Sequence, residues 1–245
     1  MTEPPRDRHR ERRAQLAANL AALRSRLAAA CAAAGRDPGE VTLVAVTKTF
    51  PAFDVRLLAE LGVRDVGENR DQEAAPKTAA CADLDLTWHF VGRLQTNKCR
   101  SVATYATVVH SVDRPRLVPA LAAAAAHAGR TVTALVQVSL DPDADASDPG
   151  RGGAPPAEVL ALADAVAAAD GLRLGGVMGI APLAGDPEPA FARLAELARA
   201  VRARHPHAAI VSAGMSGDLE AAIRRGATHV RVGTALLGGR PPPVR

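Results

Sequence analysis

Aromatic residues and lysine are both scarce in this 245-residue chain, and each shortage narrows the interpretation. Phe, Trp and Tyr together make up 2% of the residues, so Ala, Val and Leu must fill the core that a hydrophobic content of 48% allows. Arginine supplies nearly all of the positive charge, and the lysines are Lys48, Lys77 and Lys98. A single arginine therefore carries little information in this chain, whereas the position of a lysine is informative.

Several classes of protein are disfavoured by what the chain lacks. Cys31, Cys81 and Cys99 are odd in number and show no CxxC spacing, which indicates free thiols in a reducing compartment. No signal peptide opens the chain, and no uncharged apolar stretch is long enough to span a bilayer. We therefore expect a cytoplasmic protein that has no membrane contact.

The basic segment RDRHRERR (6–13) does not amount to a nucleic-acid-binding arm. Acidic residues are interspersed in it, and the formal net charge of the chain is a mild +4. No RNP, helix-turn-helix or interleaved aromatic pattern accompanies the segment. We interpret it as the solvated face of a helix and expect no nucleic acid among the partners.

Short apolar runs alternate with helical patterns along most of the chain. The runs are 41–47, 63–67, 87–92, 107–112, 131–138, 172–179, 208–213 and 228–233. Strand and helix alternating through eight units predict a single α/β domain over 1–245, a parallel (β/α)8 TIM-type barrel with an extra N-terminal helix at about 8–34. A doubly wound open sheet is the competing interpretation, because alternation alone cannot show closure.

One long irregular stretch, 139–156, interrupts this alternation after the fifth run. Loops that follow barrel strands lie on the C-terminal face, where barrel enzymes place lids, so we expect this stretch there. Three alternating aspartates imitate the start of a calcium loop, but Ala146 replaces the turn glycine and Gly152 replaces the bidentate glutamate. We therefore expect no bound metal.

Lys48 ends the first apolar run, VTLVAVTKTFP, where a buried strand would open onto the functional face of a barrel. Strand alternation puts its side chain on the same side as Val44 and Val46. A lysine in such a poorly solvated position can lose its proton and attack an aldehyde to form a Schiff base, which an arginine cannot do. The alternative is a lysine that extends to solvent or pairs with a carboxylate.

Two glycine-rich turns follow the seventh and eighth runs. SAGMSGD (212–218) and VGTALLGG (232–239) both place glycines and a hydroxyl residue where a strand stops and a helix begins. Backbone N–H groups there face an anion, and this pair of loops is where (β/α)8 barrels commonly bind phosphate. Steric demands of tight turns could explain either turn alone, but the pair favours a phosphate site.

Arg231 alternates with Val230 and Val232 in the last run, so it faces away from both and shares a side with Gly233. A guanidinium that points into a barrel mouth must have a partner. Toward an aromatic nitrogen it can donate a hydrogen bond but does not give up a proton. The alternative is an arginine that faces the outer helices and is paired there.

Several of these segments, taken together with their spacing, resemble the YggS/PROSC group of pyridoxal phosphate homeostasis proteins. The resemblance covers about residues 10 to 240 and rests on VAVTK (44–48), GEN (67–69), WHFVGRLQTNK (88–98), HSVD (110–113), GVMGIAP (176–182) and SAGMSGDLEAAIRRGATHVRVGTALLG (212–238). It implies an alanine-racemase-like barrel of the fold type III class that holds pyridoxal 5'-phosphate as a Schiff base on Lys48.

The same resemblance implies roles for further residues. Arg231 would face the pyridine nitrogen, and Asn69 would lie beside the ring. Ser212 and Met215 would lie nearby. The phosphate would be held by Ser216, Gly233 and Thr234.

The chain departs from the family pattern at a few positions around the expected pocket mouth. Arg70 and Asp71 follow GEN where an aromatic residue is common, Arg93 stands where proline is frequent, and Ala213 stands where methionine is frequent. We expect these differences to change the shape of the mouth and not the binding of the cofactor. His89 and Trp88 are interpreted as core and mouth packing, with a catalytic role as the alternative.

The implied arginine partner disfavours enzyme turnover. Pyridoxal phosphate is a strong electron sink when a carboxylate keeps its ring nitrogen protonated, and an arginine keeps that nitrogen neutral. Two-base racemisation also needs an acid or base opposite the lysine, which in alanine racemases is a tyrosine from the second domain of a partner subunit. We expect no second domain in this chain, and its one tyrosine, Tyr105, falls in a helical segment.

We therefore expect a monomeric protein that stores, buffers or delivers pyridoxal phosphate, with little or no turnover and transient contacts with client enzymes that use the cofactor. A weak amino-acid racemase is the alternative. A Schiff-base aldolase acting on a phosphorylated sugar would share the lysine and the phosphate loops, but it gives no role to Arg231.

Overall fold

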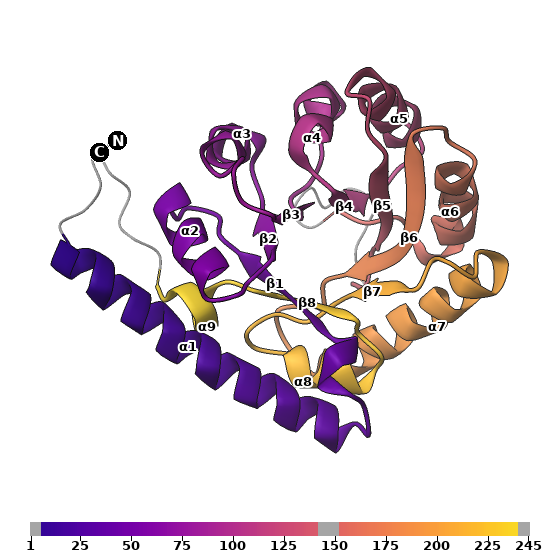
Figure 1. Ribbon diagram of the computed structural model, residues 1–245. Coiled ribbons are helices and arrows are strands. Elements are labelled where there is room, and N and C mark those ends of the chain that lie inside the picture. Colours follow the sequence, from indigo (N-terminus) through magenta and orange to yellow (C-terminus); the bar gives the residue numbers. More distant parts are fainter. Residues whose placement is uncertain (1–5, 142–151, 240–245) are drawn as a thin grey trace.

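Eight parallel strands close into a barrel in sequence order in the computed structural model, which describes residues 6–141 and 152–239 (Figure 1). The strands are β1 (Thr42–Val46), β2 (Asp65–Glu68), β3 (Thr87–Phe90), β4 (Val108–Val112), β5 (Val132–Val138), β6 (Leu172–Gly179), β7 (Ile210–Ser212) and β8 (His229–Val232). The first and last strands pair, with Thr42 opposite His229 and Ala45 opposite Val232. The predicted barrel is confirmed, and the open sheet is wrong because its two edge strands would not pair with each other.

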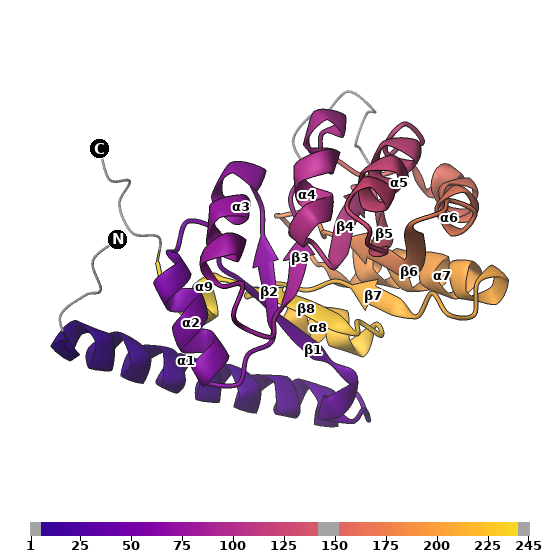
Figure 2. The ribbon, with the colours of Figure 1, turned by 45° about the horizontal axis from the view of Figure 1, so that its top comes forward.

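Helices cover the outside of the barrel (Figures 1 and 2). The α-helices in the described residues are α1 (Arg6–Ala33), α2 (Ala52–Glu60), α3 (Asp71–Ala80), α4 (Cys99–Tyr105), α5 (Leu117–His127), α6 (Val159–Ala167), α7 (Glu188–Arg204), α8 (Leu219–Arg224) and α9 (Thr234–Leu237). Short 3-10 helices are η1 (Pro38–Glu40), η2 (Thr96–Lys98) and η3 (Pro156–Glu158). The expected extra helix is α1, which runs along α2, α9 and α8 in both views.

One side of α1 is apolar and closes the barrel layer beneath it. Its buried positions recur three or four residues apart and pack with β1, β8 and α8: Leu16, Leu20, Leu23 and Leu27. The described part of the basic segment is exposed or half-buried, as a solvated face would be. Two of its arginines also make ion pairs with α2: Arg12 pairs with Asp54 at 2.7 Å and donates to the carbonyl of Leu237 at 3.0 Å, and Arg13 pairs with Glu60 at 3.2 Å.

The inside of the barrel is partly polar, whereas the main apolar layer lies between the strands and the helices. On β8, Val230 and Val232 pack outward with the leucines of α1, and Arg231 faces inward. A small apolar cluster of Val108, Leu135 and Met178 shares the interior. Charged and hydrogen-bonding side chains therefore meet at the centre of the fold.

Other expectations from the sequence can be checked only where the chain is described. The three cysteines are buried and form no disulfide, so the expectation of free thiols is confirmed. The described helices include none long and apolar enough to cross a membrane. Within residues 6–141 and 152–239, no three His, Cys, Asp or Glu side chains gather as a metal site. Most of the stretch 139–156 lies outside the described residues, so its expected position as a lid stays a prediction.

A buried ion pair joins β1, β2 and α3 behind the end of the first strand. Lys77 Nζ donates to Glu68 Oε1 at 2.6 Å and to the carbonyl of Thr47 at 2.8 Å, and Thr47 Oγ1 donates to the same carboxylate at 2.5 Å. The side chains of Lys77 and Glu68 are 7% and 0% exposed. Burial raises the pKa of Glu68, and the charge of Lys77 opposes that rise. The pair thus tethers the residue that precedes Lys48.

Replacing Lys77 by methionine should destabilise the protein by about 3–5 kcal/mol at pH 7, because the Glu68 carboxylate would be left buried without a cation. Urea unfolding measures the change. Burial already raises the pKa of Glu68 above 4.5. As the pH falls toward this raised pKa, the carboxylate takes up a proton and loses its buried charge, so the destabilisation caused by Lys77→Met should become smaller. Lys98→Met is the control: the Lys98 side chain is 32% exposed and its Nζ lies 3.5 Å from Asp71, so this substitution should cost at most about 1 kcal/mol. Equal losses in the two variants would contradict the assignment.

Candidate functional site

All eight residues that the sequence analysis assigned to the site lie at the C-terminal end of the barrel strands. Lys48 follows β1, Asn69 follows β2, Ser212 is the last residue of β7, and Arg231 lies in β8. The loops after β7 and β8 carry the remaining four: Met215, Ser216, Gly233 and Thr234. The fold brings these positions together from four strands, and their contacts with a ligand stay a prediction.

Lys48 lies in the turn that follows β1, two residues beyond the last strand residue, Val46. Its side chain is half-buried, and it makes no ion pair with any described residue. The next residue, Thr49, has a φ of 69°, a left-handed conformation that is unusual for a residue with a branched side chain, and its N–H donates to Glu73 at 3.0 Å. Lys77 and Lys98 are both paired with carboxylates, so Lys48 is the lysine that the described contacts leave available.

Arg231 is 5% exposed and faces the inside of the barrel. Its Nη1 donates to Ser212 Oγ at 2.6 Å, and its Nη2 donates to the carbonyl of Gly179 at 3.0 Å. The alternative in which it faces the outer helices is therefore wrong. Burial lowers the pKa of Arg231 to about 10, which still leaves the guanidinium charged at neutral pH.

The two glycine-rich turns lie against each other and are held by α1. Ser216 Oγ accepts a hydrogen bond from the N–H of Ala235 at 3.4 Å, which joins the turn after β7 to the start of α9. Arg26 of α1 donates to the carbonyl of Ser216 at 2.7 Å and pairs with Glu220 at 2.5 Å. Ser216 and Thr234 are half-buried and exposed respectively, so both hydroxyls can reach a ligand.

Gly214 and Gly233 show why these turns need glycine. Gly214 has a φ of +90°, and a Cβ added to it would lie 2.7 Å from the Cβ of Ala222. A Cβ on Gly233 would lie 3.2 Å from the carbonyl oxygen of Val46. The backbone of the β8 turn thus passes close to the end of β1, next to the turn that carries Lys48.

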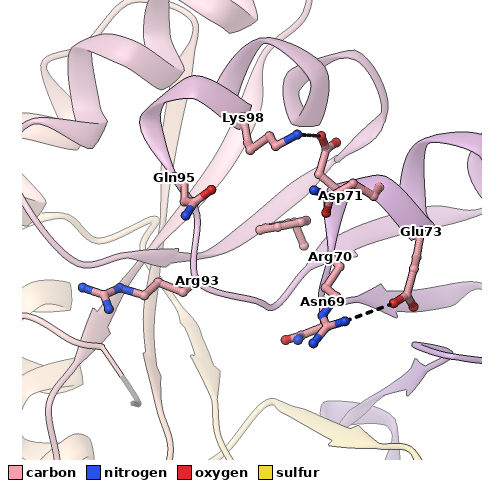
Figure 3. Close-up of a pocket in the computed structure, with 9 residues that line it drawn as sticks. Asn69, Arg70, Asp71, Glu73, Arg93, Gln95 and Lys98 are labelled. Carbon is pink, nitrogen blue, oxygen red and sulfur yellow. Dashed lines mark ion pairs between the residues drawn. The ribbon is translucent and has the colours of Figure 1, made fainter. Parts of the chain in front are cut away.

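A cavity of about 520 Å³ opens beside this site, over the ends of β2 and β3 (Figure 3). Asn69 is the one predicted cofactor residue among those that line it. The other lining residues are mostly charged or polar: Arg70, Asp71, Gln72, Glu73, Phe90, Arg93, Gln95 and Lys98. Three of the departures from the family pattern, Arg70, Asp71 and Arg93, therefore do border a pocket mouth. Gln95 and Lys98 were not predicted as site residues from the sequence, although their loop follows a barrel strand.

His89 and Trp88 differ in their surroundings although they are neighbours on β3. Trp88 packs outside the barrel with Val55, Val66 and Cys81, so the core interpretation is confirmed for it and mouth packing is wrong. His89 is buried inside the barrel and is hydrogen-bonded to His110 of β4, a residue that the sequence analysis did not single out. The signal available was strand alternation, which places both histidines on inward positions.

Tyr105 lies on α4, outside the barrel, where its hydroxyl donates to Asp71 Oδ1 at 3.4 Å. Burial, together with the negative charge of Asp71, raises the pKa of Tyr105 above its ordinary value. A phenol in this position is a neutral hydrogen-bond donor to a carboxylate. Tyr105 is not among the residues that line the cavity, although its partner Asp71 is.

Comparisons with known proteins agree over nearly the whole chain. The family model of the alanine racemase N-terminal domain matches residues 18–241. A pyridoxal phosphate homeostasis protein of Mycobacterium tuberculosis is 49% identical over 246 residues, which cover 94% of this chain and 95% of that protein.

Solved structures extend the comparison to the fold. PipY of Synechococcus elongatus PCC7942, solved with pyridoxal phosphate (PLP) bound, is 36% identical with a TM-score of 0.79, covering 91% of this chain and 100% of that one. An alanine racemase of Streptomyces lavendulae, 21% identical with a TM-score of 0.70 over 94% of this chain and 58% of that one, shares the fold alone. The chain therefore belongs to the alanine racemase N-terminal domain family and, within it, to the pyridoxal phosphate homeostasis proteins.

Proposed function

We propose that this protein binds pyridoxal 5'-phosphate covalently through Lys48 and stores, buffers or delivers it, with little or no turnover of its own. The observation that carries the proposal is the half-buried Lys48, which has no ion pair to a described residue and lies at the barrel end that also carries the two glycine-rich turns. A relative 36% identical to this chain has been solved with the same cofactor bound.

The donor groups at this end of the barrel fit the cofactor chemically. The amine of Lys48 can condense with an aldehyde, with loss of water. The hydroxyls of Ser216 and Thr234, with the backbone at Gly233, suit a phosphate, because charge-assisted hydrogen bonds to an anion are strong. Asn69 is assigned a place beside the ring. Ser212 and Met215 are assigned to the surrounding wall.

Arg231 decides which chemistry the site favours. When bound, the cofactor supplies an electron sink whose strength depends on protonation of its ring nitrogen. The guanidinium of Arg231 can donate a hydrogen bond to that nitrogen but keeps its own proton, because even its lowered pKa is about 10. We therefore assign Arg231 to hold the nitrogen neutral, which disfavours transamination and decarboxylation.

The position of Tyr105 supports a carrier over the racemase alternative. Racemisation by two bases needs a second acid or base across from the lysine. The one tyrosine of the chain lies on α4, where its ring packs against the cluster of Val66 and Trp88 outside the barrel and its hydroxyl is engaged with Asp71. It is therefore not available for the part that a tyrosine plays in alanine racemases.

The proposal includes a cytoplasmic location, a monomeric state and transient contacts with enzymes that take up the cofactor. Three buried cysteines without a disulfide fit a reducing compartment. The alternative function is a weak amino-acid racemase that uses the same lysine.

Borohydride reduction of the loaded protein should place the pyridoxyl group on Lys48. In Lys48→Arg the side chain keeps its charge but cannot form the Schiff base, so the visible absorption band should disappear. Lys98→Arg is the matched control and should keep the band, because that lysine is engaged with Asp71. Peptide mapping by mass spectrometry identifies the modified residue, and an adduct chiefly on Lys77 or Lys98 would overturn the assignment.

Pyridoxal without its phosphate should bind far more weakly than the phosphorylated cofactor, because it forfeits several charge-assisted hydrogen bonds of about 1.5–3 kcal/mol each. Replacing both Ser216 and Thr234 by alanine should lower the affinity for pyridoxal phosphate and leave that for pyridoxal nearly unchanged. Absorbance titration measures both affinities. Thr104→Ala, at an exposed position on α4, is the control. An equal loss for the two aldehydes would refute the phosphate assignment.

The wild-type protein should not exchange the α-hydrogen of D- or L-alanine with solvent deuterium at a rate near those of ordinary enzymes, about 1 to 10³ per second. A neutral ring nitrogen delocalises a carbanion poorly, and a single base returns the proton to the face it left. Proton NMR and chiral chromatography follow exchange and racemisation. Robust racemisation by the wild type that Lys48→Ala abolishes would favour the racemase.

A further inference from the structure

A continuous line of hydrogen bonds crosses the inside of the barrel from one end to the other. Asp65 Oδ1 lies 3.0 Å from His89 Nε2, and His89 Nδ1 lies 2.8 Å from His110 Nε2. His110 Nδ1 lies 2.9 Å from Ser212 Oγ, which accepts from Arg231 Nη1 at 2.6 Å. The five side chains come from β2, β3, β4, β7 and β8. We call this set the interior chain.

The interior chain links two different environments. Its last four members are at most 5% exposed: His89, His110, Ser212 and Arg231. Asp65 is the first residue of β2, so it lies at the N-terminal end of the barrel, and its side chain is 26% exposed. A partly solvated carboxylate at one end is thus connected to the guanidinium near the other end, where the cofactor residues gather.

With both imidazoles neutral and the carboxylate of Asp65 ionised, one arrangement of hydrogens satisfies every link. A guanidinium can only donate, so Ser212 Oγ accepts from Arg231. At the other end the carboxylate of Asp65 can only accept, so with neutral imidazoles the hydroxyl hydrogen of Ser212 goes to His110 Nδ1. His110 must then carry its hydrogen on Nε2 and donate to His89 Nδ1. His89 in turn carries its hydrogen on Nε2 and donates to the carboxylate of Asp65. Every donor points from Arg231 toward Asp65.

The electrostatic surroundings favour this arrangement. Burial lowers the pKa of His110 well below 6.5, and the nearby His89, Arg231 and His229 act in the same direction, so its imidazole is neutral. His229 lies beside the line, with its ring centroid 6.1 Å from that of His89, and burial lowers its pKa to about 4. Both imidazoles next to His89 are therefore uncharged at pH 7.

Arg231 needs a strong, fixed hydrogen-bond acceptor, and the interior chain provides one at Ser212. Its guanidinium is buried, and the described residues offer it two neutral acceptor oxygens, Ser212 Oγ and the carbonyl of Gly179. Hydrogen bonds in series polarise one another, so the carboxylate at the far end strengthens the acceptor that Arg231 meets. Removing a middle member would leave the Ser212 hydroxyl free to turn, and Nη1 would lose its fixed partner.

We propose that Asp65, His89 and His110 are positioning residues for Arg231, and that the interior chain orients its guanidinium toward the ring of the cofactor. The inference rests on the proposed function, since the ligand of Arg231 is the cofactor assigned there. It adds that a residue at the N-terminal end of the barrel, Asp65, helps to orient a cofactor-binding residue near the C-terminal end through hydrogen bonds inside the barrel.

The first test reads the hydrogens directly and does not depend on the cofactor. Nitrogen-15 NMR of histidine-labelled protein at pH 7, assigned with His89→Gln and His110→Gln, should show both imidazoles neutral with the hydrogen on Nε2. A charged imidazole, or a hydrogen on Nδ1 in either residue, would overturn the interior chain. If His110→Gln does not fold, single His→Gln variants of the other six histidines assign the signals of His110 by elimination.

The second test breaks the interior chain at His110 and measures cofactor binding. His110→Phe should weaken binding of pyridoxal phosphate about ten- to hundredfold, as expected for disturbing a hydrogen bond to a charged group, and should shift the visible band of the loaded protein. His110→Gln keeps a donor and an acceptor and should recover part of both. His127→Phe, at an exposed position on α5, is the control and should match the wild type.

Asp65→Asn tests the partly exposed end of the interior chain with little change in the shape of the side chain. It removes the negative charge and should produce a smaller change in the same direction as His110→Phe, about three- to tenfold in affinity. This variant keeps the test decisive if His110→Phe fails to fold. A wild-type spectrum with affinity within about twofold in Asp65→Asn, or in a folded His110→Phe, refutes the positioning role. Failure of the proposed function is distinct, because the wild type itself would then show no visible band.

Discussion

The cost of burying a guanidinium is the constraint on which the rest of the barrel interior depends. Arg231 is 5% exposed, and an isolated charge in such a place would be strongly unfavourable. Strand alternation leaves no choice of side, since Val230 and Val232 fill the apolar layer under α1. The neighbouring strands supply acceptors at Ser212 and Gly179, and two histidines continue the line behind Ser212. One inward arginine thus accounts for a polar centre in a chain that is otherwise rich in Ala, Val and Leu.

The availability of Lys48 depends on a second lysine, Lys77, being held in an ion pair of its own. Lys77 is bound to Glu68 behind β1 and also donates to the carbonyl of Thr47, the residue before Lys48. The same contacts therefore occupy the lysine that could compete for an aldehyde and fix the turn that carries the one left available. Of the three lysines, Lys77 and Lys98 are engaged with carboxylates, and the described contacts leave the amine of Lys48 available.

Local patterns were sufficient for much of the fold and for part of the site. Alternation of strands and helices predicted the barrel, and strand alternation put Arg231 on the side opposite Val230 and Val232, although which side faces inward was settled by the structure. The glycine-rich turns were recognisable because the need for a positive φ or a close backbone approach, as at Gly214, shows in the sequence itself. The hydrogen bond from His110 to Ser212 was not predictable, because it joins residues 102 positions apart. This hydrogen bond depends on the strand registers and on closure of the barrel, and neither can be read from a short stretch of sequence.

The sequence by itself determined the alternation of eight strands with helices, the residues that share a side within each strand, and the residue types available at the strand ends. These properties follow from periodicity and from the chemistry of single side chains. Only the tertiary structure decided that Lys77 is paired while Lys48 is not, that Trp88 faces the helices, and that a line of side chains connects Asp65 to Arg231. Each of these depends on distances between segments remote in the chain, which are fixed when β1 and β8 meet and the eight strands take a common register.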